Sequence, residues 1–102
     1  MRRSKPTTEF GRDVKRLRKR GLDMDKLGNL LDTLIEEKPL SPLCRDHPLK
    51  GQWAGCRDCH VAGDWILIYR IEALPTHDRL PGGPTEAVIL IRTGTHSDIF
   101  SS

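Results

Sequence analysis

The sequence lacks long apolar runs. No stretch approaches the roughly 20 apolar residues that a membrane-spanning helix needs. The basic amino terminus is also not followed by an apolar segment of the kind found in signal peptides. We therefore expect a cytoplasmic protein with no membrane partner.

Cysteine and chain length are also limited. There are only three cysteines, Cys44, Cys56 and Cys59, and an odd number without an export signal indicates reduced thiols rather than a disulfide framework. A chain of 102 residues leaves room for one domain, residues 1–102. With 36% hydrophobic and 30% charged residues, the composition is typical of a soluble globular protein rather than a disordered one.

Positive charge is concentrated at the amino terminus. Residues 1–21 contain nine Lys or Arg and two carboxylates, a net charge of +7. Because the whole chain carries +3, the other residues together carry −4. Such a segment can attract a phosphate backbone or an acidic protein. An ordinary solvated helix face would give the same charge run, so the pattern leaves both interpretations open.

Two helices are predicted in the amino-terminal third. Apolar residues at helical spacing, a threonine cap and Gly21 predict a helix over about residues 8–20. Asp23 can cap a second helix that ends before Pro39. Its apolar stripe, which we expect to face the core, consists of Met24, Leu27, Leu30, Leu31, Leu34 and Ile35.

Strands are predicted after the helices. Residues 54–61, 65–71 and 86–92 have strand composition, and the last two are apolar on both faces. The segment 74–85, rich in Pro and Gly, is predicted to be a long loop. Residues 1–7 are polar, so an edge strand is not expected there. The predicted fold class is α+β, with an N-terminal two-helix hairpin packed on an antiparallel sheet.

Histidines and aspartates stand near the ends of the predicted strands. His47, His60 and His96 lie in short polar settings, and Asp64 begins the most apolar strand. In a regular strand Asp58 and His60 point to the same face, with Cα atoms roughly 6.5 Å apart. A carboxylate there can orient or charge an imidazole. A single histidine in such a setting is more often a surface or hydrogen-bonded structural residue, so the clustering of the three carries the functional interpretation.

These residue types suit RNA cleavage without a metal. The reaction needs a base for the 2′-hydroxyl proton, an acid for the leaving 5′-oxygen and positive charge near the phosphate. Histidine can serve as acid or base near neutral pH because its ordinary pKa is about 6.5. Phe100 or Trp65 could stack an unpaired base, although Trp65, inside an apolar strand, fits a core position better.

A rival interpretation comes from Cys56 to His60, which match the C-x-x-C-H pattern of haem attachment and offer two thiols for zinc. Haem attachment requires export, and zinc would need further ligands at unusual spacing. In a strand Cys56 and Cys59 also fall on opposite faces, which favours packing. We therefore expect no metal and no cofactor.

Taken together, several blocks of the sequence resemble the RelE superfamily of ribosome-dependent mRNA interferases, in particular its YafQ branch. Each block alone is weak, but in this order they are jointly specific, and they cover most of the chain. The blocks are Arg12-Asp13-Val14-Lys15, Asp46-His47-Pro48-Leu49-Lys50-Gly51, WAGCRDCHV (residues 53–61), GDWILIY (residues 63–69) and Arg92-Thr93-Gly94-Thr95-His96 with Phe100.

The resemblance implies the toxin of a type II toxin–antitoxin pair, which cleaves mRNA on the ribosome by 2′-hydroxyl attack. The acid–base and phosphate-stabilising residues would be His47, His60, Asp64 and His96, with His96 as proton donor. Asp58 and Phe100, together with Trp65, are the candidate positioning residues. The implied partners are a cognate antitoxin, the ribosome and mRNA, with operator DNA reached only through the antitoxin complex. Residues expected to meet RNA are Arg12, Lys15, Arg16, Arg18, Lys19, Arg20 and Lys50.

Two features depart from the family pattern: the insertion at residues 74–85, and cysteines at 56 and 59 where an aromatic and a small residue are common. Neither removes a matched catalytic position. Two alternatives remain open from the sequence, a non-cleaving ribosome- or antitoxin-binding module with the same fold and a small zinc module.

Overall fold

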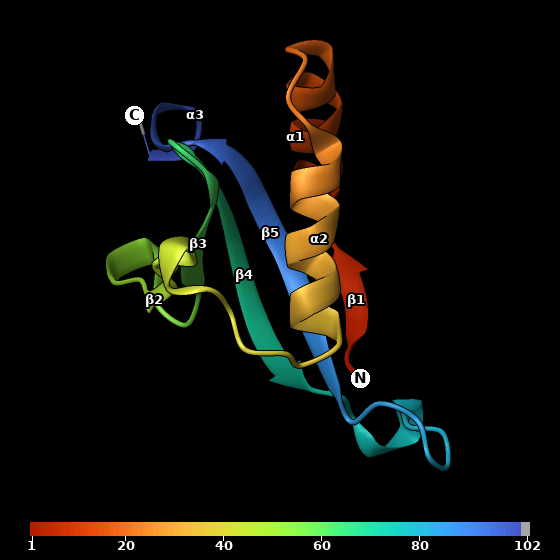
Figure 1. Cartoon of the computed structure of the whole chain (residues 1–102). Coiled ribbons are helices and arrows are strands. Elements are labelled where there is room, and N and C mark those ends of the chain that lie inside the picture. Colours follow the sequence, from red (N-terminus) through yellow and green to blue (C-terminus); the bar gives the residue numbers. More distant parts are fainter. Residues whose placement is uncertain (101–102) are drawn as a thin grey trace.

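The structure, a computed structural model, describes residues 1–100 and consists of one sheet with helices (Figure 1). None of the helices in this part of the chain is long and apolar enough to cross a membrane. The strands are β1 (Arg3–Pro6), β2 (His47–Pro48), β3 (Arg57–Ala62), β4 (Trp65–Ala73) and β5 (Glu86–Thr95). The helices are α1 (Thr8–Lys19), α2 (Met24–Ile35) and α3 (His96–Phe100), with 3-10 turns η1 (Pro42–Cys44), η2 (Gly51–Trp53) and η3 (Thr76–Asp78).

The sheet is mixed, with the strand order β1-β5-β4-β3-β2. Strands β2 to β5 are antiparallel, whereas β1 runs parallel to β5. The α+β class is confirmed, but the expectation of a purely antiparallel sheet without a strand in residues 1–7 was wrong. Strand β1 is a short edge strand with mostly exposed side chains, so backbone pairing rather than apolar composition defines it.

The helices start where their caps predict. The Thr7 side chain accepts a hydrogen bond from the Phe10 amide, and the Asp23 side chain accepts one from the Asp25 amide. Gly21, with φ of +84°, makes the turn between α1 and α2. The predicted bounds of α1 and the predicted start of α2 therefore agree with the structure to within about one residue, and α2 ends at Ile35, before Pro39 as expected.

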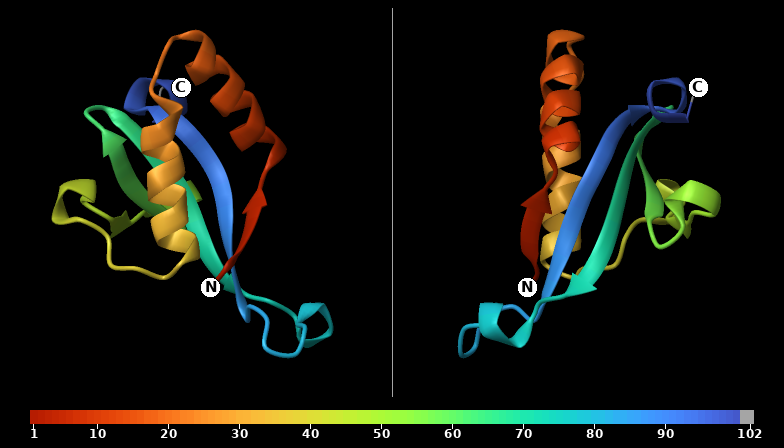
Figure 2. Two further views of the ribbon diagram at one scale, coloured as in Figure 1. Left: turned by 45° about the vertical axis from the view of Figure 1, so that its right-hand side comes forward. Right: turned by 180° about the vertical axis from the view of Figure 1, so that it is seen from behind.

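The strands differ more from expectation. Strand β3 begins at Arg57, not at residue 54, because Gly55 adopts a φ of +90° in the turn that follows η2. Strands β4 and β5 extend beyond the predicted ends. Neither β2 nor α3 was predicted, since elements of two and five residues leave little periodicity to detect. The loop 74–85 contains η3 and projects from the body at the end opposite α3 (Figures 1 and 2).

The centre of the sheet is buried on both faces. Because side chains alternate along β4, Trp65, Leu67 and Tyr69 join α1 and α2 in one apolar cluster. Ile66 and Ile68 face the other way, into a second cluster covered by the segments around η2 and α3. Both helices thus lie on one face, as Figure 2 shows, and the second face supports the residues considered below.

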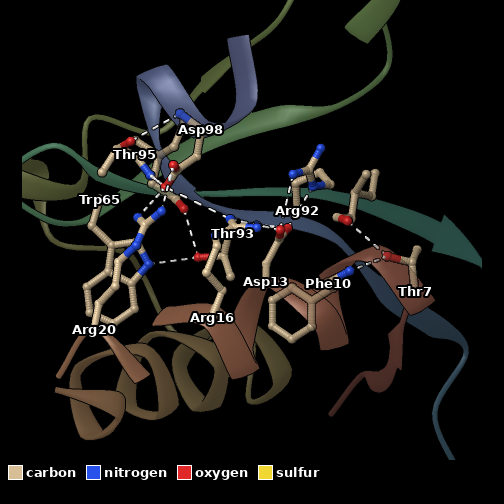
Figure 3. A network of polar contacts seen from close by, with 12 residues as sticks. Thr7, Phe10, Asp13, Arg16, Arg20, Trp65, Arg92, Thr93, Thr95 and Asp98 are labelled. Carbon is tan, nitrogen blue, oxygen red and sulfur yellow. Dashed lines mark hydrogen bonds and ion pairs between the residues drawn. The ribbon is translucent and has the colours of Figure 1, made fainter. Parts of the chain in front are cut away.

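A buried carboxylate joins α1 to β5. Asp13, only 2% exposed, accepts hydrogen bonds of 2.6 and 3.1 Å from the Arg92 guanidinium and one of 3.1 Å from the Thr93 amide. Arg16 lies 3.0 Å from the same carboxylate (Figure 3). The Asp13 carboxylate also raises the pKa of Arg92. Removing this group would leave buried donors without an acceptor.

We expect Asp13→Ala to lower the free energy of unfolding by about 3 to 5 kcal/mol, the usual effect of removing one partner from a buried pair. Urea denaturation followed by circular dichroism measures the change. The matched control is Asp32→Ala on exposed α2 surface, which should stay within about 0.5 kcal/mol. A similar small effect for Asp13→Ala would contradict the structural role of this network.

Candidate active site

Three histidines from separate segments lie close together, two of them beside Asp58 and the third beside His96. Asp58 Oδ2 lies 4.0 Å from Nε2 of His47 and 4.0 Å from Nε2 of His96. The ring centroids of His60 and His96 are 5.6 Å apart. The convergence that the sequence suggested is therefore confirmed as geometry, while the chemical roles stay predictions.

Strand pairing produces this convergence. His47 in β2 lies opposite Asp58 in β3, and Asp58 and His60 point to one face because they are two residues apart. On the other side of β4, β5 ends at Thr95 opposite Trp65. The first residue of α3, His96, therefore arrives at the end of the sheet where β3 turns into β4.

Asp58 is the most unusual group in the cluster. It is 2% exposed, and within residues 1–100 its Oδ1 has no hydrogen-bond partner. A buried carboxylate is costly unless positive charge or donors compensate it. His47 and His96 are placed to provide that charge when they carry an extra proton.

In each of the three imidazoles, Nδ1 lies next to an oxygen that accepts hydrogen bonds. His47 Nδ1 lies 2.8 Å from the Arg45 carbonyl oxygen, and His60 Nδ1 lies 3.1 Å from the Gly63 carbonyl oxygen. His96 Nδ1 contacts a carboxylate oxygen of Asp64. Since these partners only accept, each Nδ1 must carry the hydrogen. Each neutral ring then has its lone pair on Nε2, where it can take a proton.

Aromatic side chains border the cluster. The Phe100 ring, on a residue 39% exposed, lies 5.9 Å from the His96 ring and 6.0 Å from the edge-on Trp53 ring. Trp53 was not singled out from the sequence, because no pattern in residues 51–53 predicted the turn η2 that places it. Trp65 lies elsewhere: it is buried in the helix-facing cluster and donates to Thr93 Oγ1, which corrects its candidate role in base stacking to core packing.

The segment before His47 is held by a second aspartate. Asp46 accepts hydrogen bonds from Arg57 Nε at 3.1 Å and from the Tyr69 hydroxyl at 2.6 Å. Burial, followed by the contact with Asp46, raises the pKa of Tyr69 above its usual range, so the hydroxyl stays a donor. This anchor, which the sequence analysis missed, fixes the chain entering β2.

The basic residues divide into two groups. Arg16 is paired with Asp13, and Arg20 with Asp98, so two of the expected RNA contacts have intramolecular partners. The pKa of Asp98 is lowered by Arg20 and by the Thr95 backbone. The remaining candidates are exposed and include four residues of α1 and one residue beside β2: Arg12, Lys15, Arg18, Lys19 and Lys50.

Cys56 and Cys59 are separated by the sheet. Cys56 belongs to the second cluster and Cys59 to the helix-facing cluster, and both are buried. Burial raises the pKa of Cys59, which disfavours a thiolate ligand. In the part of the chain that the structure describes, no group of three His, Cys, Asp or Glu residues is arranged to hold a metal ion.

A hollow of about 600 Å³ opens beside His60. It lies where β3 extends beyond the two residues that pair with β2. Its other lining residues are Ser41, Leu43, Cys44, Arg45, Val61, Ala62 and Gly63. The hollow therefore adjoins the histidine cluster through one shared imidazole.

Comparison with known proteins finds bacterial toxins of the YafQ family. The family model for the bacterial toxin YafQ of type II toxin–antitoxin systems matches residues 2–101. An mRNA interferase toxin YafQ from Escherichia coli K12 is 42% identical over 93 residues, covering 90% of this chain and 88% of that protein.

Solved structures agree. Crystal structures of YafQ from Escherichia coli BL21(DE3) and of the Escherichia coli DinJ-YafQ toxin-antitoxin complex have TM-scores of 0.80 and 0.77 to this chain. The first is 38% identical and covers 99% of this chain and all of the other. The second is 40% identical and covers 98% of each.

The Nδ1 contacts predict one tautomer at all three positions. In the neutral state His47, His60 and His96 should carry their proton on Nδ1, as long-range ¹H–¹⁵N correlation spectra report. Exposed His77 in η3 serves as the reference ring. A dominant Nε2–H form at any of the three would contradict the arrangement of donors and acceptors described above.

Proposed function

This chain belongs to the YafQ family of bacterial toxins of type II toxin–antitoxin systems, and we propose that it is an endoribonuclease that cleaves mRNA on the ribosome. The placement of His47 and His96 at Asp58, with His60 beside His96, carries the proposal. The name of the Escherichia coli relative, an mRNA interferase, supports the same activity.

In the proposed reaction the protein catalyses phosphoryl transfer within the RNA by moving protons, without a metal ion. Nε2 of His47 or His60 takes the proton of the ribose 2′-hydroxyl, and the oxygen attacks the adjacent phosphorus. The bond from phosphorus to the 5′-oxygen breaks, and protonated His96 donates its Nε2 proton to that oxygen. The products are a 2′,3′-cyclic phosphate and a free 5′-hydroxyl.

Two carboxylates would support this cycle. Asp64 holds Nδ1–H of His96, which leaves Nε2 to exchange the proton with the leaving group. Asp58 lies 4.0 Å from both His47 and His96 and compensates the positive charge of whichever ring is protonated. The same positive charge stabilises the phosphate as negative charge develops during attack.

The substrate would be held by stacking and charge. Phe100 is exposed beside His96 and can stack an unpaired base, which places the scissile phosphate among the imidazoles. The hollow beside His60 provides room for a neighbouring nucleotide. Contacts with ribosomal RNA and mRNA phosphates are assigned to the exposed basic residues Arg12, Lys15, Arg18, Lys19 and Lys50.

The proposed protein partner is a cognate antitoxin, since a structural relative is a DinJ-YafQ toxin-antitoxin complex. Operator DNA would be bound only through that complex. We further propose that the toxin forms one domain over residues 1–102 and acts in the cytoplasm, where ribosomes and mRNA are present.

Purified protein added to ribosomes programmed with a defined mRNA should cut the message, as primer extension detects. His96→Ala should reduce the cleavage rate about 100-fold or more, because it removes the proton donor. Ribosome binding, measured by co-sedimentation, should stay within about twofold of the unmodified protein.

The matched control is His77→Ala, an exposed histidine in the projecting loop, which should cleave normally. Unchanged cleavage by His96→Ala would exclude the proposed proton donor. Binding of the unmodified protein to ribosomes without any cleavage would instead indicate the non-cleaving module.

A further inference from the structure

Helix α3 is short, yet it carries both His96 and Phe100. It has five residues, too few to be stable in isolation. Its first turn is closed by reciprocal contacts: the Asp98 amide donates to Thr95 Oγ1 at 3.1 Å, and the Thr95 amide donates to Asp98 Oδ2 at 3.0 Å. The placement of His96 therefore depends on what holds Asp98.

Asp98 is held from the end of α1. Arg20 donates two hydrogen bonds to its carboxylate, from Nη1 at 2.8 Å and from Nη2 at 3.1 Å. Such a two-point arginine–carboxylate contact fixes orientation as well as distance. Arg16 Nη2 adds a longer contact at 3.9 Å (Figure 3). The Arg20 contact is the largest cause of the lowered pKa of Asp98.

Gly94 provides independent evidence that this contact is built into the fold. A Cβ atom at this position would lie 3.0 Å from Asp98 Oδ2 and 3.3 Å from Arg16 Nη2. A side chain there would therefore push the carboxylate away from the end of β5. Glycine allows Asp98 to lie directly against the strand while it faces α1.

We infer that Arg20 and Asp98 are positioning residues that fix α3, and through it His96, against Asp58 and Asp64. Arg20 fixes α3 through its contact with Asp98, and the buried Ile99 packs α3 against the second apolar cluster. This assigns Arg20 a different role from the RNA contact expected from the sequence. The consequence for cleavage rests on the proposed function, since it requires His96 to act in the reaction.

The geometry leaves little tolerance for movement of α3. His96 Nε2 is 4.0 Å from Asp58, while Nδ1 of the same ring contacts Asp64. Both contacts depend on where the first turn of α3 lies. A displacement of about 1 Å in a reacting group can reduce a rate about 100-fold, so loss of the brace should reduce turnover more than binding.

The test compares Arg20→Ala, Arg20→Lys and Asp98→Asn in the full chain. We expect Arg20→Ala to lower kcat about tenfold or more in the ribosomal cleavage assay, with KM within about twofold. Arg20→Lys should recover part of the rate, because lysine keeps the charge but not the two-point contact. Asp98→Asn keeps an oxygen for the Thr95 amide and should resemble Arg20→Ala.

The matched control is Arg70→Ala. Arg70 on β4 is also a half-exposed arginine paired with a carboxylate, Glu72 at 2.6 Å. Its removal should change neither kcat nor KM. The double variant Arg20→Ala/Asp98→Asn should be no slower than the slower single variant, since both remove the same interaction.

A second readout does not depend on activity. The ring resonances of His96 should shift or broaden in spectra of folded Arg20→Ala, while those of exposed His77 stay unchanged. An increased KM with normal kcat and unchanged His96 resonances would overturn the inference and make Arg20 an RNA contact. If His96→Ala still cleaves, the proposed function fails, but the His96 resonances still decide whether Arg20 positions the ring.

Discussion

The pairing of β4 with its two neighbours is the constraint on which the remaining structure depends. Trp65, the first residue of β4, lies opposite Ala62 of β3 and Thr95 of β5. The end of one strand and the beginning of α3 are thereby brought to the same place. His60 and His96, distant in sequence, become neighbours without any direct bond between them. Apolar side chains on both faces of β4 keep this register, because a shift by one residue would exchange the two clusters.

Carboxylate–arginine pairs then hold in place the elements that strand pairing alone does not fix. Asp13, Asp46 and Asp98 each accept hydrogen bonds from an arginine, and these pairs attach α1, β2 and α3 to the core. A guanidinium keeps its proton at every physiological pH, so the positive charge in these three pairs does not change with pH. Asp58 differs, because within residues 1–100 its ionic partners are imidazoles. Imidazoles gain and lose protons near neutral pH, so charge compensation at Asp58 changes with the proton transfers that cleavage would require.

The sequence predicted the elements that have caps or long apolar periods. Helices α1 and α2 and strands β4 and β5 belong to this group, and the same-face placement of Asp58 and His60 followed from strand alternation. Strand β1 could not be predicted, because its polar residues are defined by backbone pairing with a strand over 80 residues away. Trp53 and Asp46 were missed for a related reason: their roles arise from tertiary contacts of short turns. The sequence could not distinguish Arg16 and Arg20 from the other basic residues of this segment, because their pairing with Asp13 and Asp98 depends on the tertiary structure.

The basic residues on and next to α1 connect the exposed surface of that helix with the position of α3. Arg16 on α1 and the exposed Arg20 at its C-terminal end are tied to Asp13 and Asp98, whereas Arg12, Lys15, Arg18 and Lys19 extend into solvent. Helix α1 therefore presents positive charge to solvent, while Arg16 and Arg20 near its C-terminal end contact Asp98 of α3. A polyanion bound to the exposed charges would bind the same rigid element that braces His96. Binding and the placement of His96, the proposed proton donor, would thus be linked through α1, since Asp13 keeps that helix fixed to β5.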